Sequence, residues 1–456
     1  MVGISKALVI TPDKLNTYIG EETKGINHSR YFVNNVKKYL DSVSSRVLLI
    51  TGLRSTGKTI GILQAIKNTD TTYISPIYKG SCTEDDIKDI LINTVSRNIV
   101  IDEYSWITGS SDSLANFIAG LTKTGKKIIL TGTESAVIHG LQSSELIHRA
   151  IEIHTNYCSY EEYRKIFDLS LNSDTMLKYL QSGGIFESKI NESFGNMRNY
   201  IQTAIINNIA AFLPEYDINQ IKLGVYTYFY NCITENYKPV SIPVYNYEKT
   251  ELSFEEYLDD FGIKTDISID KNTFNEISNV LESLQIAVKL EDIRIPNHTR
   301  IYIVNQALSY NLVKAIYQLD TVSDKYLGHL YEASVVCNFY FNKPSVYDMY
   351  FLEGRKRGID YEIDFILKDK TEAYIFECKY SKNDNFELSE TASIAKDIIP
   401  NILGDCDVSG RIVIYQGNSK TGITNGKDII YTNDWNIDYE HFDDLLKTLH
   451  PNMIIE

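Results

Sequence analysis

Cysteine is scarce in this chain, and long apolar runs are absent. The six cysteines lie far apart and no two have the spacing of a metal-ligand pair, so neither a disulfide framework nor a cysteine-based metal site is expected. No apolar run approaches the ~20 residues that a membrane-spanning helix needs. The N-terminal segment lacks a long apolar region and a cleavage site, so no signal peptide is expected. These absences predict a cytoplasmic protein with reduced thiols and no membrane association.

Basic residues are also fewer than acidic ones. The chain of 456 residues carries 45 Lys and Arg against 60 Asp and Glu, a formal net charge of −15. Broad electrostatic binding to nucleic acid needs cations that face the phosphates, so this balance argues against it and leaves only a local basic groove. The length is enough for roughly two to four domains of ~100–200 residues each.

One short segment carries a specific chemical signature. Residues 52–59 fit G-x-x-x-x-G-K-[ST], the phosphate-binding loop of P-loop NTPases. An apolar run at residues 46–50 precedes the loop and suits a buried strand, and residues 60–66 after it read as a helix. Backbone N–H groups and a helix N-terminus meet at such a turn and attract phosphate. A chance match is the alternative, and the flanking strand and helix argue against it.

The loop residues are assigned individual roles from this motif. Lys58 would reach the β- and γ-phosphates of ATP, and the Thr59 hydroxyl would be a ligand of Mg²⁺. The candidate nucleotide-binding residues are Gly52, Leu53, Arg54, Ser55, Thr56, Gly57, Lys58 and Thr59.

A second motif supplies the acids that hydrolysis needs. Residues 98–101 suit a buried strand, and Asp102 and Glu103 emerge at its C-terminal end. Asp102 would hold Mg²⁺, directly or through water, and Glu103 would orient and deprotonate the attacking water. The alternative is a strand that simply ends in a solvated acidic turn. The position of the motif after the phosphate-binding loop favours catalysis.

The following strands contribute weaker candidates. At the end of the strand expected at 127–132, a hydroxyl would sense the γ-phosphate or else cap a turn, and Thr133 is the candidate selected over Thr131 and Ser135. Arg149 precedes the strand expected at 150–154. It would stabilise charge in the transition state or else form a salt bridge.

The order of elements predicts the architecture. Short apolar runs alternate with helical stretches from 46 to 156, which indicates βαβ units and a parallel sheet. The pattern from about 157 to 310 is mostly helical and ends in a hairpin, as in a winged helix. The segment 270–276 that would open its recognition helix is not basic, so packing against another domain is favoured over reading DNA. A further α/β pattern follows, with a tail helix expected at 440–449.

Two strands expected between residues 358 and 380 carry a second set of charged side chains. They form a hairpin in which alternation puts Glu377 and Lys379 on one face, where Asp364 of the paired strand lies beside Glu377. Glu332, on a preceding helix, would add a third acid. Carboxylates and a lysine that converge in this way bind Mg²⁺ and activate water near a phosphodiester.

The first two thirds of the chain resemble the prokaryotic AAA/STAND-type P-loop ATPases. The resemblance covers about residues 20–310 and implies a P-loop core followed by a helical lid and a winged-helix domain. The family usually has Gly before the arginine and Pro after Gly-Gly-Ile, whereas His148 and Phe186 stand here. The matching motifs are, in order, residues 52–59, Asp102-Glu103, residues 130–135, Arg149, residues 159–163 and residues 183–185.

The C-terminal hairpin resembles the PD-(D/E)xK nuclease fold. The resemblance implies that Asp364, Glu377 and Glu332 are metal ligands and that Lys379 positions the nucleophilic water. Residues 321–456 contain 14 Lys and Arg against 23 Asp and Glu, a net charge of −9 that is unhelpful for DNA, although residues 355–357 form a small basic cluster. Both metal-dependent cleavage and a nuclease fold used only for binding stay open.

Together these observations predict an α/β protein with a P-loop NTPase parallel-sheet core, a helical lid, a winged-helix-like middle and a C-terminal α/β restriction-endonuclease-like domain. The expected function is hydrolysis of ATP with Mg²⁺ to control the nuclease-like domain, which would cleave DNA. The alternative is a nucleotide-dependent signalling or scaffold switch that binds a protein or nucleic-acid partner. An arginine acting in trans would require an oligomer. The expected domains are residues 1–156, 157–215, 216–319 and 320–456.

Overall fold

The computed structural model describes most of the chain. The described residues are 6–109, 112–133, 138, 146, 148–184, 193–236, 253–263, 267–356, 359–381, 402–404, 406–424 and 427–433. Several sequence expectations lie outside them, namely residues 134 and 135 of the motif at 130–135, residue 185 of the motif at 183–185, Phe186, residue 357 of the basic cluster and the tail helix at 440–449. Among the described helices, none combines the length and the apolar character needed to cross a membrane.

The N-terminal part of the chain builds a six-stranded sheet in the order β1-β3-β4-β5-β2-β6. All neighbours pair in parallel except β1, which runs antiparallel to β3. The five strands expected between 46 and 154 are confirmed, whereas β1 was not anticipated. The strands are β1 (Ala7–Ile10), β2 (Val47–Thr51), β3 (Thr71–Pro76), β4 (Asn98–Ile101), β5 (Lys127–Thr131) and β6 (Ala150–His154).

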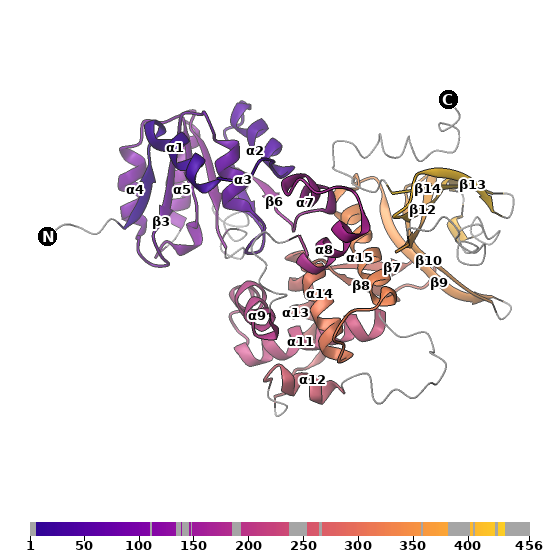
Figure 1. Ribbon diagram of the computed structural model, residues 1–456. Helices are drawn as coiled ribbons and strands as arrows, with labels where there is room; N and C mark the ends of the chain where they lie inside the picture. Colours follow the sequence, from indigo (N-terminus) through magenta and orange to yellow (C-terminus); the bar gives the residue numbers. More distant parts are fainter. Residues whose placement is uncertain are drawn as a thin grey trace.

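Helices cover both faces of this sheet (Figure 1). Alternate residues of β2 belong to different apolar clusters: Leu48 and Ile50 pack with α1, α2 and α3, whereas Val47 and Leu49 pack with α4 and α5. A strand buried on both faces is typical of parallel sheets and explains its continuous apolar sequence. The covering elements are α1 (Pro12–Glu22), α2 (Phe32–Asp41), α3 (Lys58–Ala65), α4 (Glu84–Ile92), the short 3₁₀ turn η1 (Tyr104–Trp106) and α5 (Asp112–Thr122).

A helical region follows β6, as the sequence predicts. Figure 1 shows it between the first sheet and the C-terminal strands. Its described elements are α7 (Tyr160–Ile166), α8 (Ser173–Ser182), α9 (Phe194–Tyr200), the π-helical turn η3 (Ile201–Ile206), α10 (Asn207–Phe212), α11 (Ile218–Asn236), α12 (Phe254–Asp260), α13 (Lys271–Ser283), α14 (Gln306–Ile316) and α15 (Asp324–Asn342).

A second sheet has eight strands in the order β13-β14-β12-β11-β10-β9-β7-β8. The expected hairpin of the middle region is present as β7 and β8, but β7 pairs in parallel with β9, so the hairpin extends the C-terminal sheet. The domain boundary expected between residues 319 and 320 therefore falls between helices α14 and α15, and the strands that precede and follow it belong to one sheet. The strands are β7 (Ala287–Asp292), β8 (Thr299–Ile303), β9 (Asp348–Lys356), β10 (Ile359–Lys368), β11 (Glu372–Lys379), β12 (Asp407–Tyr415), β13 (Lys420–Thr424) and β14 (Lys427–Thr432).

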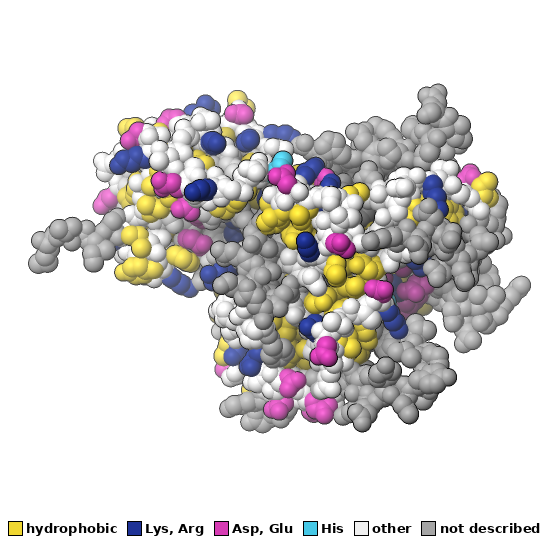
Figure 2. Space-filling model, in the orientation of Figure 1, with side chains coloured by type: hydrophobic (Ala, Val, Ile, Leu, Met, Phe, Trp, Pro, Cys, Tyr) yellow, Lys and Arg dark blue, Asp and Glu magenta, His cyan; other side chains and the backbone are white. Residues whose placement is uncertain are grey.

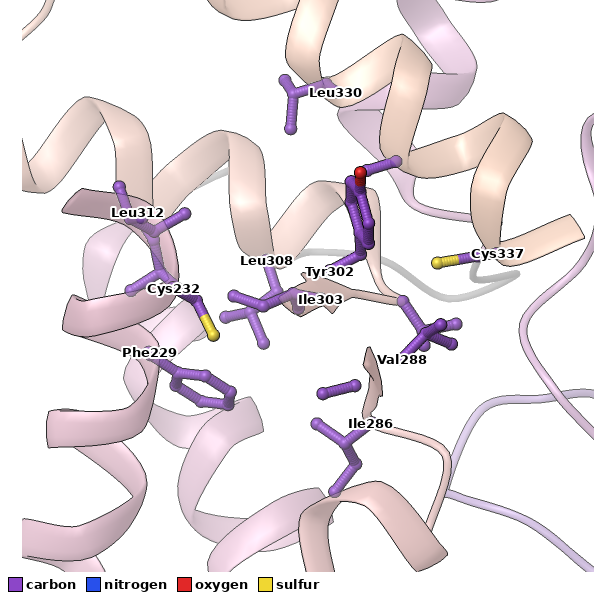
Figure 3. Packing of buried hydrophobic residues seen from close by; sticks show 14 of the residues in the cluster. Phe229, Cys232, Ile286, Val288, Tyr302, Ile303, Leu308, Leu312, Leu330 and Cys337 are labelled. Carbon is purple, nitrogen blue, oxygen red and sulfur yellow. The ribbon is translucent and has the colours of Figure 1, made fainter. Parts of the chain in front are cut away.

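One apolar cluster joins the middle helices to this sheet. Figure 3 shows Phe229 of α11 and Leu312 of α14 on one side of the hairpin strands, with Cys337 of α15 on the other. Ile303 of β8 and Val288 of β7 fill the space between them and are buried. The hairpin is thus held both by strand pairing and by packing against three helices.

Candidate functional site

The predicted phosphate-binding loop connects β2 to α3, as the motif requires. Its backbone uses the left-handed region at Gly52 (φ 134°) and Gly57 (φ 82°), which glycine adopts without steric cost. A Cβ at Gly52 would lie 2.3 Å from the backbone oxygen of Thr155, so this position also needs glycine for close packing. The strand–loop–helix context of the motif is therefore confirmed.

Lys58 is the first residue of α3 and is buried, with 7% of its surface exposed. Its Nζ donates to the carbonyl oxygens of Gly52 at 2.8 Å and Leu53 at 2.7 Å. Burial lowers the pKa of Lys58 to about 8, against the opposing influence of Glu103 and Asp102. The ammonium is thus held inside the loop, where a phosphate charge would stabilise it.

Asp102 lies directly after β4 and is buried. Its Oδ2 accepts hydrogen bonds from the Thr59 hydroxyl at 2.9 Å and from the Tyr73 hydroxyl at 2.6 Å, and its Oδ1 accepts from the Glu103 N–H. The structure thus brings together Thr59 and Asp102, the two predicted Mg²⁺ ligands. Tyr73 was not predicted. Burial, followed by the charge of Asp102, raises the pKa of the Tyr73 hydroxyl, which therefore stays a donor.

Glu103 adopts a left-handed backbone conformation with φ 51°. Its Oε2 accepts from the N–H and the hydroxyl of Thr133, both at 3.0 Å. Burial and the neighbouring Asp102 raise the pKa of Glu103, which makes it a better proton acceptor at neutral pH. Because β5 lies between β2 and β4, the turn after β5 reaches the end of β4, and Thr133 contacts the predicted base Glu103.

Residues 44–164 match a family model described as an AAA domain. This segment is an AAA-type P-loop ATPase domain. The match contains the loop, both acids and all strands of the first sheet except β1. Among curated proteins, no match to the chain was found.

The chain is also similar to solved structures, at low identity. The Orc1 protein of Aeropyrum pernix in complex with DNA is 9% identical, covers 68% of this chain and 98% of its own, and has a TM-score of 0.27. The Holliday junction branch migration motor RuvB of Thermotoga maritima is 16% identical, covers 59% of this chain and 91% of its own, and has a TM-score of 0.28. Both scores are too low to assign a function.

Arg149 of the AAA domain lies away from the loop. Its carbonyl oxygen accepts from the N–H of Val47 at 2.8 Å, so Arg149 is beside the start of β2, whereas the loop follows the end of β2. The length of β2 at ~3.3 Å per residue puts ~16 Å between these points. A catalytic role for the exposed Arg149 stays a prediction, and it would require a second copy of the chain.

Arg30 of the N-terminal segment contacts the loop, although no motif marks it. Its Nη1 donates to the carbonyl oxygens of Thr56 at 2.6 Å and Asn156 at 2.7 Å, and its Nη2 donates to that of Tyr157 at 3.2 Å. Its Nε and Nη2 also donate to the two carboxylate oxygens of Glu162, each at 3.0 Å. This buried arginine therefore joins the phosphate-binding loop to the first helix after the AAA sheet.

The C-terminal sheet brings together three of the predicted residues of the second set. Asp364 Oδ2 accepts from the Cys378 N–H at 2.6 Å, and Lys379 Nζ lies 2.8 Å from Glu377 Oε1. Glu377 Oε2 is buried and has no hydrogen-bond partner in the described part of the protein. Burial raises the pKa of Glu377 to about 7, and burial followed by the charge of Glu377 raises the pKa of Asp364.

Glu332, the fourth predicted residue, is engaged by the β7–β8 hairpin. Its Oε1 accepts from the Tyr302 hydroxyl at 2.7 Å and lies 3.4 Å from Arg300 Nη1. Burial opposes ionisation, but a hydrogen bond from His329 and the charge of Arg300 hold the pKa of Glu332 at about 2. Within the described residues, no group of three or more His, Cys, Asp or Glu is arranged to hold a metal ion. A three-carboxylate metal site thus stays a prediction that requires Arg300 to move.

Proposed function

We propose that the AAA domain binds ATP with Mg²⁺ and hydrolyses it. The observation that carries the proposal is the meeting of Thr59 and Asp102 beside the loop, with Glu103 held next to them by Thr133. A hydroxyl and a carboxylate at this place suit Mg²⁺, which prefers oxygen ligands. A second carboxylate with a raised pKa suits a proton acceptor for water.

Each residue of the site has a role that follows from its position. The loop N–H groups and Lys58 would hold the phosphates, while Thr59 and Asp102 would hold Mg²⁺. Bound Mg²⁺ would neutralise charge on the phosphate oxygens. Glu103 would orient a water molecule and take its proton, and Thr133 fixes the carboxylate oxygen that faces β5.

Nucleotide turnover by the purified full-length chain tests this proposal. Lys58→Ala should abolish phosphate release, because it removes the buried ammonium that the carbonyl oxygens of Gly52 and Leu53 hold in the loop. Glu103→Gln should retain ATP binding and lose about 10²–10⁴-fold in turnover, the usual contribution of a general base. Lys67→Ala, an exposed lysine just beyond α3, is the matched control. Turnover that survives Lys58→Ala would refute the assignment.

A second activity is proposed for the C-terminal sheet, namely metal-dependent cleavage of a phosphodiester under control of the AAA domain. The unpartnered Oε2 of Glu377, beside Lys379, supports it, because a buried carboxylate oxygen without a donor is suited to a cation. Plasmid nicking and phosphate release should be followed together with ATP and Mg²⁺ or Mn²⁺. Glu377→Gln should end nicking without changing phosphate release, whereas Glu291→Gln, an exposed acid on β7, should change neither.

The alternative is a nucleotide-dependent switch that binds a protein or DNA without cleaving it. On the face seen in Figure 2, the described Lys and Arg side chains are scattered among Asp and Glu and form no continuous basic stripe, which favours a protein partner. Tight ATP binding with negligible turnover, and no nicking in any nucleotide state, would favour this alternative.

A further inference from the structure

Arg30 uses its whole donor set inside the protein. A guanidinium has five N–H groups, and the five acceptors around Arg30 are three backbone carbonyls and the two carboxylate oxygens of Glu162. The side chain is almost completely buried. Such an arrangement fixes the guanidinium in one orientation, because any rotation breaks several charge-assisted hydrogen bonds together.

The bond to the Thr56 carbonyl has a consequence for the next residue. A planar trans peptide points its C=O and the following N–H in opposite directions. With the Thr56 carbonyl held by Arg30 at 2.6 Å, the Gly57 N–H is directed to the other side of the loop. Gly57 itself offers little resistance to rotation of this peptide, because glycine at φ 82° has alternatives open to it. Arg30 therefore fixes the orientation of the peptide between Thr56 and Gly57, which Gly57 alone would leave free to rotate.

The same carboxylate that holds Arg30 also caps the start of α7. Glu162 Oε2 accepts from the Ser159 N–H at 3.0 Å, and the Ser159 hydroxyl accepts from the Glu162 N–H, which makes a capping box at the start of α7. Glu162 Oε1 also accepts from the Tyr31 N–H at 2.8 Å. The orientation of the loop peptide and the first turn of α7 thus depend on one buried ion pair.

We propose that Arg30 is a positioning residue for phosphate binding. It directs the Gly57 N–H toward the bound phosphate and, through Glu162, ties that orientation to the start of α7. The inference rests on the proposed binding of ATP at the loop. A purely structural role, in which Arg30 only anchors the N-terminal segment, makes a different prediction for the kinetics.

Steady-state ATP hydrolysis by the full-length chain distinguishes the two roles. Arg30→Lys keeps the charge, but an ammonium cannot hold the Thr56 carbonyl and both Glu162 oxygens at once. The KM for ATP should rise about tenfold or more, the loss expected for a misplaced hydrogen bond to a charged group. The kcat should change less than about twofold, because the contact is made equally in the ground and transition states.

Two further variants complete the test. Arg164→Lys makes the same replacement on α7, where the arginine contacts Glu161 and the carbonyl of Leu169, and it should leave both constants unchanged. Glu162→Gln keeps the Thr56 contact but removes the charge of the ion pair and replaces one accepting oxygen, which Arg30 shares with a backbone N–H, by an NH2 group. Its KM should rise by about threefold. Wild-type KM in folded Arg30→Lys or Glu162→Gln protein would overturn the proposal, as would a fall in kcat alone. No turnover by the wild type would instead refute the proposed function.

Discussion

Lys58 is a cation held in a buried site, and its protonation can be measured through stability. Its Nζ is surrounded by loop carbonyls, and burial lowers its pKa to about 8 from an ordinary value of 10.5. Below about pH 8 the lysine is charged in both the folded and the unfolded chain. Between pH 8 and 10.5 the unfolded chain binds more protons than the folded one, so the free energy of unfolding rises with pH.

The size of this rise follows from the two pKa values. Their difference corresponds to about 3 kcal/mol at ~1.36 kcal/mol per pH unit, reached only above pH 10.5. At about pH 9.5 the rise should be about 2 kcal/mol relative to about pH 7. No correction for solvent screening is needed, because only 7% of the residue is exposed.

Lys58→Met isolates the contribution of this one group. The side chains are similar in length, and titration of all other groups cancels in the difference between the two proteins. Of the two tryptophans in the chain, Trp106 follows Glu103 within the AAA domain, so a Trp435→Phe background makes fluorescence report on this domain alone. Urea unfolding at about pH 7 and about pH 9.5 then gives the free energy of unfolding of each protein.

The wild type should gain about 2 kcal/mol over Lys58→Met between these two pH values. An identical pH dependence in the two proteins would refute the reasoning, because it would show that Lys58 is not held in a site that disfavours its charge. A bound ATP analogue that resists hydrolysis should remove the rise from the wild type, since phosphate charge keeps the ammonium protonated.

Three further predictions concern packing and charge. Gly52→Ala should abolish ATP binding measured by calorimetry, because its Cβ would lie 2.3 Å from a backbone oxygen, whereas Gly120→Ala, with nothing within 4 Å, should bind normally. Tyr73→Phe removes a 2.6 Å hydrogen bond to the carboxylate after β4 and should lower the free energy of unfolding by about 1.5–3 kcal/mol, so an unchanged urea midpoint would contradict it. Arg300→Met should cost about 3–5 kcal/mol at about pH 7 by removing the cation beside the buried carboxylate of Glu332, and the loss should shrink toward about pH 4 as that carboxyl protonates. An equal loss at both pH values would argue against this account.

The sequence predicts the local parts of the site well because their determinants are contiguous. The loop is one segment between an apolar strand and a helix, and Asp102 and Glu103 are adjacent residues at a strand end. Because the neighbouring strands β4 and β5 are parallel and end at the same edge of the sheet, Thr133 lies next to Glu103, and no long-range contact has to be predicted separately.

The parts that were missed depend on contacts between distant segments. Arg30 and Glu162 are 132 positions apart, and Tyr73 is 29 positions from Asp102. Nothing in the residues around Arg30 distinguishes it from any exposed arginine that precedes a helix. The hairpin of β7 and β8 was expected from its own pattern, but a local pattern cannot state that β7 pairs with β9. The burial of Arg300 among the C-terminal carboxylates follows from that pairing and was missed with it.

The pairing of β7 with β9 also restricts where the chain can bend. Motion of the middle helices against the C-terminal strands would have to break backbone hydrogen bonds of a shared sheet and the packing of Figure 3. The connection between β6 and α7, residues 155–159, spans from the first sheet to everything that follows. We therefore expect two rigid bodies and one hinge. Arg30 donates to two carbonyls of that hinge and to one of the phosphate-binding loop. We therefore expect a conformational change at the loop to be coupled to rotation of the second body.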